Sequence, residues 1–191
     1  MDGYFVGIRA GPAGAGQEKT AMTDATPVGY STVAPWIVTE DTPALLGFIS
    51  RVLGGEELGR VALEDGSIGH AEIRVGNTVL LAFDRREGWP ALPSLLRVWV
   101  PDADAAMDAA IGAGATVVTE SATSAFGQRG GRIRDPFGNI WWIVTQREIV
   151  DDAEGMRRLT EPSYAEGMRR AQQSLDRELG GRGAEPSRPL T

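Results

Sequence analysis

Polar and aromatic residues stand at alternate positions of two predicted strands, where their side chains share one face of a sheet. His70 and Glu72 form one such pair, and Arg97 and Trp99 form the other. A lone imidazole can act as a general base, and a purely structural, hydrogen-bonded histidine is the alternative. An arginine beside an aromatic ring suits a planar ligand with an acidic group. These residues therefore indicate either acid–base chemistry or the binding of a small molecule.

The composition excludes several other kinds of chemistry. The 191 residues include no Cys, one His and one Lys, Lys19, which excludes thiol nucleophiles, disulfides and sites with two His ligands. Ser67 near His70 lacks a nucleophile-elbow pattern, so we expect no catalytic triad. A net charge of −7 argues against a nucleic-acid partner. Because the sequence contains neither an apolar run of about 20 residues nor a signal peptide, we expect a cytoplasmic protein.

Hydrophobic periodicity and turn residues predict two successive sets of elements. The first set has a strand at 32–38, a helix that starts within 39–43 and ends at Gly54-Gly55, and strands at 58–63, 68–75 and 78–83. The second set has a strand at 95–100, a helix that begins at 101–104 and ends at 112–114, and strands at 116–119, 127–134 and 140–145. Both sets therefore follow the order β-α-β-β-β.

A constant offset of 62 residues relates the two sets. Gly76-Asn77 precedes Gly138-Asn139 by 62 positions. The same offset pairs Val38 with Val100, Ala44 with Ala106, and Ile49 with Ile111. An unchanged offset at both ends of the unit indicates an internal duplication. It also aligns His70 with Arg132, so these side chains are expected to converge near the mouth of a cavity.

The segments outside the repeat differ in composition. Residues 1–28 are rich in Gly and Pro and are expected to form a flexible leader, with Met22 as an alternative start. Capping signals predict a helical extension at 151–180, and 181–191 is expected to be a flexible tail. The extension carries an apolar stripe for packing against this chain or a partner, formed by Tyr164, Met168, Ala171, Leu175 and Leu179.

The tandem units, with Asp135-Pro136-Phe137-Gly138-Asn139 before the last strand, resemble the vicinal oxygen chelate (VOC) superfamily. That superfamily includes glyoxalase I, ring-cleaving dioxygenases and bleomycin-resistance proteins. Gly69-His70-Ala71-Glu72-Ile73 and the segment 135–142 look more narrowly like its PhnB-like branch. The resemblance implies an α+β fold in which tandem βαβββ modules form a curled mixed sheet, followed by a C-terminal helix. The VOC domain would span 29–150, with module one at 30–84 and module two at 94–146, and a homodimer is expected.

The resemblance also bears on metals and cofactors. Metal-binding members place one ligand on the first strand and one on the last strand of each unit. Carried onto this chain, those positions are Val33, Leu80, Leu95 and Trp142. None of these side chains has a donor for a metal ion, so we expect no metal and no cofactor.

If the family register holds, strand alternation defines the concave face. That face would hold Val33, Pro35 and Ile37 from the first strand, Leu95, Arg97 and Trp99 from its repeat, and Leu80, Ala82, Trp142 and Val144 from the closing strands. The alternative is that both tryptophans belong to the core and that Arg97 forms a surface ion pair. We expect ligand contacts from Arg97, Trp99, Trp142, His70, Glu72 and Arg132.

These features lead to one preferred functional hypothesis and two alternatives. We expect a metal-free small-molecule binding protein of bleomycin-resistance type, which sequesters an aromatic or amphipathic metabolite or drug and so confers antibiotic resistance. The first alternative is a VOC-superfamily lyase, isomerase or dioxygenase with a displaced metal site or with His70 as base. The second alternative is a dimeric assembly module that acts through the C-terminal helix.

Overall fold

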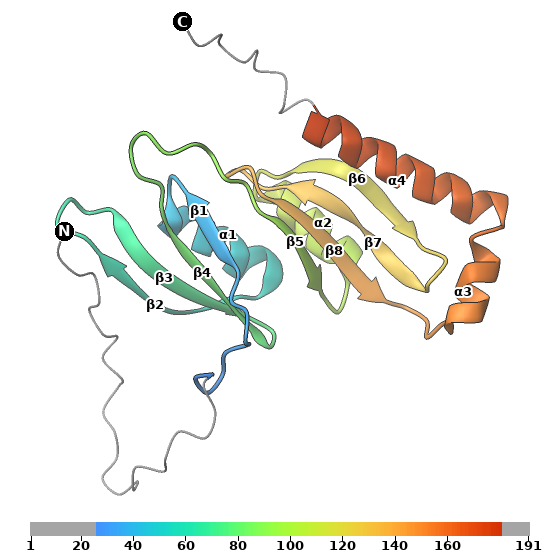
Figure 1. The fold of residues 1–191 in the computed structure, drawn as a ribbon, viewed down its shortest axis with the longest axis horizontal. Helices are drawn as coiled ribbons and strands as arrows, with labels where there is room; N and C mark the ends of the chain where they lie inside the picture. The colour runs from blue at the N-terminus through green and yellow to red at the C-terminus, as the bar shows by residue number, and fades with distance from the viewer. Residues whose placement is uncertain (1–25, 181–191) are drawn as a thin grey trace, which may run out of the picture.

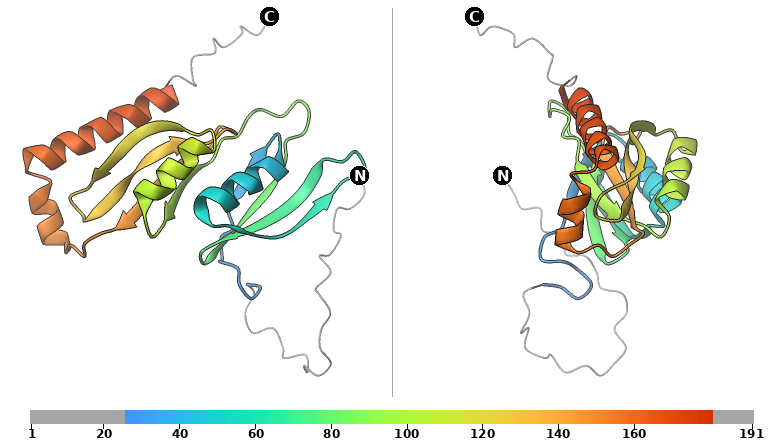
Figure 2. Two further views of the ribbon diagram at one scale, coloured as in Figure 1. Left: turned by 180° about the vertical axis from the view of Figure 1, so that it is seen from behind. Right: turned by 90° about the vertical axis from the view of Figure 1, so that its right-hand side faces the viewer.

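Two four-stranded sheets lie side by side in the computed structural model, which describes residues 26–180 (Figure 1). Helices α1 and α2 cover one side of the sheets, and the C-terminal helix α4 lies on the other side (Figure 2). We call the side of each sheet away from α1 and α2 its outer face. The expected tail at 181–191, Met22 and most of the expected leader lie outside the described residues.

The element order is the predicted one. Module one contains β1 (Trp36–Thr39), α1 (Thr42–Leu53), β2 (Glu56–Ala62), β3 (Ile68–Val75) and β4 (Thr78–Asp84). Module two contains β5 (Leu95–Trp99), α2 (Ala103–Gly112), β6 (Thr116–Thr123), β7 (Gln128–Arg134) and β8 (Ile140–Gln146). Two helices follow, α3 (Asp152–Arg158) and α4 (Pro162–Gly180). The predicted α+β fold of tandem βαβββ modules with a C-terminal helix is confirmed.

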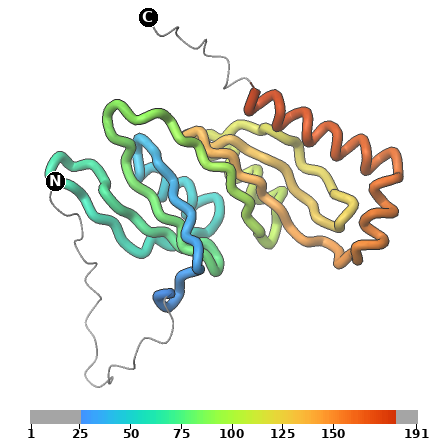
Figure 3. Tube along the Cα trace, in the orientation of Figure 1, coloured from blue at the N-terminus to red at the C-terminus, as the bar shows by residue number. Residues whose placement is uncertain are grey.

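Both sheets have the same topology. The strand orders are β1-β4-β3-β2 and β5-β8-β7-β6. In each sheet the first strand runs parallel to the last strand of its module, and the remaining neighbours are antiparallel. After β8 the chain turns through α3 and returns across module two as α4 (Figure 3).

Matching hydrogen bonds at the two helix starts correct the offset of the repeat. Asp41 caps α1 and Asp102 caps α2. Thr42 N donates to Asp84 Oδ1 at 2.8 Å, and Ala103 N donates to Thr145 Oγ1 at 2.8 Å. The equivalent residues are therefore 61 apart, and the predicted offset of 62 is wrong by one for these elements.

The hairpin turns explain part of the discrepancy. Val75 pairs with Thr78 around a two-residue turn, whereas Asp135 N donates to Asn139 O at 2.9 Å across a turn that is one residue longer. Glu72 of β3 pairs with Leu81 of β4, and Arg132 of β7 pairs with Trp142 of β8. The structural equivalent of Arg132 is thus Glu72, and the predicted match of His70 with Arg132 is wrong.

Because side chains alternate along a strand, an error of one residue in the repeat offset assigns a side chain to the opposite face of the sheet. The predicted faces of β1 and β4 in module one are wrong for this reason. Ile37, Leu80 and Ala82, predicted on the concave face, are buried in the core. Their neighbours Trp36 and Phe83 occupy the outer face instead. Val33 precedes β1 and is exposed. In module two the predicted face holds, with Arg97 lying over both Trp99 and Trp142.

One apolar core joins the two modules. It fills the space between the sheets and the helices α1 and α2, and the rings of Phe48 and Phe137 meet edge-to-face at 6.5 Å across the module boundary. No residue of α4 is buried, but the helix packs against β6, where the hydroxyls of Ser174 and Thr119 lie 2.6 Å apart. The apolar stripe of α4 thus faces its own chain in part. None of the helices within 26–180 has the length and apolar character needed to cross a membrane.

The turn between β7 and β8 is organised by a buried carboxylate. Asp135 is 3% exposed, and its Oδ1 accepts hydrogen bonds from Phe137 N at 3.0 Å and Asn139 N at 2.8 Å. Its Oδ2 accepts from Asn139 Nδ2 and from Trp141 Nε1, both at 2.9 Å. Four donors thus depend on one side chain, and buried donors without an acceptor are costly.

Replacing Asp135 is expected to destabilise the protein. Asp135→Asn puts an amide donor against existing donors, so the free energy of unfolding should fall by about 3 kcal/mol, measured by urea denaturation. The control is Asp65→Asn in an exposed turn, where the carboxylate bonds only to Ser67. That change should lower the free energy of unfolding much less than Asp135→Asn does. Equal losses in the two variants would contradict the role given to Asp135.

Candidate functional site

Adjacent strands of module two bring three predicted residues together. In the parallel pair β5–β8, Arg97 lies beside Trp142, and Trp99 lies beside Val144. Arg97 Cζ is 4.6 Å from the centroid of the Trp99 ring and 4.1 Å from that of Trp142. Both distances are typical of cation–π contacts. The guanidinium of Arg97 is therefore held against two indole rings on the outer face.

Arg132 enters the same group from β7. It pairs with Trp142 in the sheet, and its Cζ lies 4.6 Å from the Trp142 ring centroid. The residue is 8% exposed, and its Nη1 donates to Thr119 Oγ1 at 3.2 Å and to Ala171 O at 2.9 Å. Arg132 thus contacts the sheet, the aromatic ring and α4 together.

Neither arginine has an acidic partner within residues 26–180. Arg97 donates to the side-chain oxygen of Gln128, and the partners of Arg132 are neutral oxygens. Burial lowers the pKa of both guanidinium groups, and the charge of Arg97 lowers the pKa of Arg132 further. A carboxylate partner would act in the opposite direction. On the outer face of module two, Arg97 and Arg132 therefore carry positive charge that no carboxylate of residues 26–180 pairs with.

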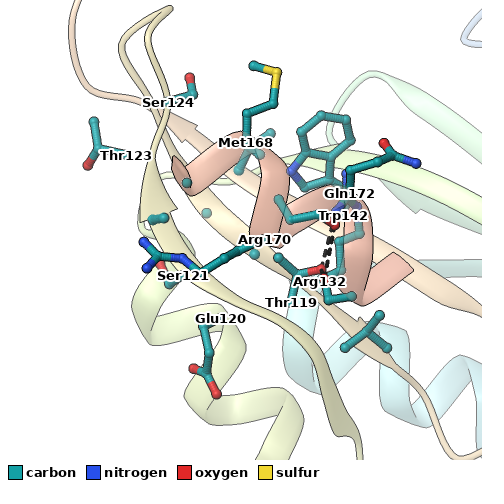
Figure 4. A pocket seen from close by; sticks show the side chains of 18 of the residues that line it. Thr119, Glu120, Ser121, Thr123, Ser124, Arg132, Trp142, Met168, Arg170 and Gln172 are labelled. Carbon is teal, nitrogen blue, oxygen red and sulfur yellow. Dashed lines mark hydrogen bonds between the residues drawn. The ribbon is translucent and has the colours of Figure 1, made fainter. Parts of the chain in front are cut away.

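A cavity of about 990 Å³ lies between this face and α4 (Figure 4). The sheet contributes Thr119, Arg132 and Trp142, and the helix contributes Met168 and Gln172 among others. This volume is within the usual range for small-molecule sites. Arg97 and Trp99 do not line the cavity, but Gln128, which accepts the hydrogen bond from Arg97, does.

His70 and Glu72 lie in the other module and form a separate cluster. His70 Nε2 is 3.0 Å from Glu72 Oε1, and Tyr30 donates its hydroxyl to Glu72 Oε2. The hydrogen bond to Glu72, followed by burial, raises the pKa of Tyr30. The Trp36 ring packs edge-on to His70 at 5.6 Å and to Phe83 at 5.3 Å. The six predicted site residues therefore fall into two groups on two sheets.

Several residues of these clusters were not predicted from the sequence. Trp36 was not among the predicted residues, because the error in the repeat offset placed Pro35 and Ile37 on the concave face instead. Tyr30 precedes the first strand, where no periodic signal exists. Met168 belongs to the predicted apolar stripe, but that pattern does not say which surface the stripe covers.

Comparison with known proteins identifies the family. Residues 29–143 match the model of the Glyoxalase/Bleomycin resistance protein/Dioxygenase superfamily, and the chain belongs to this superfamily. An uncharacterized protein of Mycobacterium tuberculosis, Rv0887c, is 33% identical in an alignment of 146 residues, and the match covers 71% of this chain and 84% of that protein. The uncharacterized protein Mb0911c of Mycobacterium bovis is 34% identical over 120 residues, which cover 57% of this chain and 79% of that protein.

Solved structures support the same fold. TioX from Micromonospora sp. ML1 is 23% identical, covers 61% of this chain and 98% of its own, and superposes with a TM-score of 0.52. Protein PA1353 from Pseudomonas aeruginosa is 19% identical with the same coverage and the same TM-score. At these identities the likeness concerns the fold alone. Helices α3 and α4 lie beyond the segment that matches the family model.

The metal site that the family implies does not fit the residues present. At the expected positions, Leu95 and Trp142 lie on the outer face, Leu80 lies in the core and Val33 precedes β1. These side chains offer no oxygen, imidazole or thiolate donor. Within residues 26–180, no three His, Cys, Asp or Glu side chains are grouped closely enough to hold a metal ion.

Proposed function

We propose that this protein is a metal-free small-molecule binding protein of bleomycin-resistance type that sequesters an aromatic or amphipathic metabolite or drug. The observation that carries the proposal is the pair Arg97 and Arg132, which contact one Trp142 ring and have no acidic partner among the described residues. An anionic ligand would supply the missing negative charge, and its planar part would stack on the indole.

The cavity next to these residues supports the same proposal. Its wall combines apolar groups such as Trp142 and Met168 with many polar and charged ones, among them Glu120, Arg132 and Arg170, a mixture that suits an amphipathic molecule. Arg132 is buried, and burying a positive charge without an acidic partner costs free energy that a bound anion would offset. The narrower likeness to the PhnB-like branch stays a prediction.

An anionic aromatic probe tests this function. We expect 2-naphthoate to bind the full chain in isothermal titration, and neutral 2-naphthamide to bind about tenfold more weakly because it lacks the charge. Arg97→Ala and Trp142→Ala should each lower the affinity for 2-naphthoate about tenfold. Arg86→Ala is the matched control, since Arg86 also lies over a tryptophan, Trp89, at 5.7 Å. Wild-type affinity in both site variants would refute the assigned pocket.

A second candidate is an enzyme that uses His70 as base. The cluster of His70, Glu72 and Tyr30 favours it, because the hydrogen bond to Glu72 would orient the imidazole. Trp36 and Phe83 form an apolar wall beside the imidazole. This candidate places the chemistry on module one, away from the arginines.

Metal analysis separates the two candidates. For the binding protein we expect substoichiometric divalent metal after mild purification, by mass spectrometry, because the family ligand positions carry no donors. We also expect His70→Ala to leave the affinity for 2-naphthoate unchanged. One bound metal per chain that His70→Ala removes would instead favour the enzyme.

We also propose that the protein forms a homodimer. Trp36, Leu95 and Trp99 are large apolar residues that are 48%, 57% and 53% exposed. Groups of exposed apolar side chains commonly mark interfaces, and twofold pairing is the commonest arrangement. Sedimentation equilibrium should give twice the chain mass, and Trp36→Ser should weaken self-association. The mass of a single chain at micromolar concentration would contradict the dimer.

A further inference from the structure

Helix α4 crosses the outer face of module two although it lies outside the family-matched segment. Two hydrogen bonds attach its middle to the sheet. Arg132 Nη1 donates to Ala171 O at 2.9 Å, and the hydroxyls of Ser174 and Thr119 lie 2.6 Å apart. The helix has no buried residue, so it adds little to the core of the molecule. Its attachment therefore depends on a few polar contacts and on an incompletely covered apolar stripe.

The space between α4 and the sheet is the cavity described above (Figure 4). Met168 and Gln172 are one helical turn apart and line it from the helix, opposite Arg132 and Trp142. A helix that packed directly on the sheet would leave no such space, because side chains in protein interiors interdigitate closely. The side chain of Met168 is 48% exposed, and a ligand in this space would cover part of its apolar surface.

Arg132 connects the helix to the charge of the site. Among residues 26–180, Arg132 donates hydrogen bonds through Nη1 alone, so Nε and Nη2 have no protein acceptor there. An arginine has five N–H donors in a fixed plane. The same guanidinium can therefore hold α4 through Nη1 and bind an anionic group through its remaining donors.

We propose that α4 forms a wall of the ligand site and contacts the bound ligand through Met168 and Gln172. Ligand selectivity is then set partly by a helix outside the family domain. This inference rests on the proposed binding function and extends it to residues 162–180. In the bound state the sheet residues Arg132 and Trp142 contact the ligand from one side, and the helix contacts it from the other side.

A reversible cross-link tests whether the site works with the helix in place. The sequence contains no Cys, so Thr119→Cys with Ser174→Cys introduces one defined pair of thiols. The native hydroxyls are close enough for the sulfurs to bond. We expect the oxidised full chain to bind 2-naphthoate with a Kd within about twofold of the reduced form. Dissociation, measured by stopped-flow tryptophan fluorescence, should be slower. Absence of binding after oxidation would mean that α4 obstructs the site and would overturn the proposal.

Substitutions on the helix test the contact itself. In the full chain, Met168→Ala and Gln172→Ala should each lower the affinity for 2-naphthoate about fivefold or more, because each removes contact area from the wall. Arg169→Ala is the control, since Arg169 does not line the cavity and pairs with Glu166. Circular dichroism of each variant checks that the helix remains folded.

The possible results distinguish this inference from the proposed function. If Arg97→Ala and Trp142→Ala weaken binding while Met168→Ala and Gln172→Ala do not, the site stands and the wall assigned to α4 is wrong. If the full chain shows no saturable binding of 2-naphthoate, both proposals fail. If the helix variants weaken binding as the sheet variants do, both are supported.

Discussion

The carboxylate of Asp135 determines which way the two tryptophans of β8 point. It accepts the indole N–H of Trp141 on the core side, and because strand side chains alternate, Trp142 faces the outer side. The same carboxylate holds Asn139, whose Oδ1 accepts from Ser94 N at 3.0 Å just before β5. One buried acid therefore fixes the register that places Arg97 beside Trp142, and the geometry of the candidate site depends on it.

The charge of the site contrasts with that of the rest of the chain. The protein has a net charge of −7, and many of its other described arginines pair with carboxylates, as Arg158 does with Glu148 and Glu154. In α3, hydrogen bonds from Arg157 and Arg158 lower the pKa of Glu154 to about 2. Arg97 and Arg132 have no such partner within the described residues, although acidic side chains are abundant. Positive charge against aromatic rings on an acidic protein is a local property of this face, and it favours anionic ligands over cationic ones.

The two modules share one scaffold but differ in the chemistry of their outer faces. Glu72 on β3 of module one and Arg132 on β7 of module two occupy equivalent positions, each paired with a residue of the last strand of its module. Glu72 organises Tyr30 and His70, whereas Arg132 contacts Trp142 and α4. Opposite charges at equivalent positions mean that the modules cannot bind the same group in the same way. Of the two outer faces, that of module two packs against the terminal helix.

The order of helices and strands was readable from the sequence, because caps and turns are local: Asp41 and Asp102 begin the helices that the pattern predicted. The grouping of Arg97 with Trp99 and Trp142 was also readable, since alternation along adjacent strands determines it. Tertiary structure alone decided the rest. The one-residue difference between two turns reversed a face and put Trp36 where Ile37 was expected. The apolar stripe of α4 matched several surfaces equally well, and only packing of the whole chain selected β6, because burial against a distant strand leaves no trace in local periodicity.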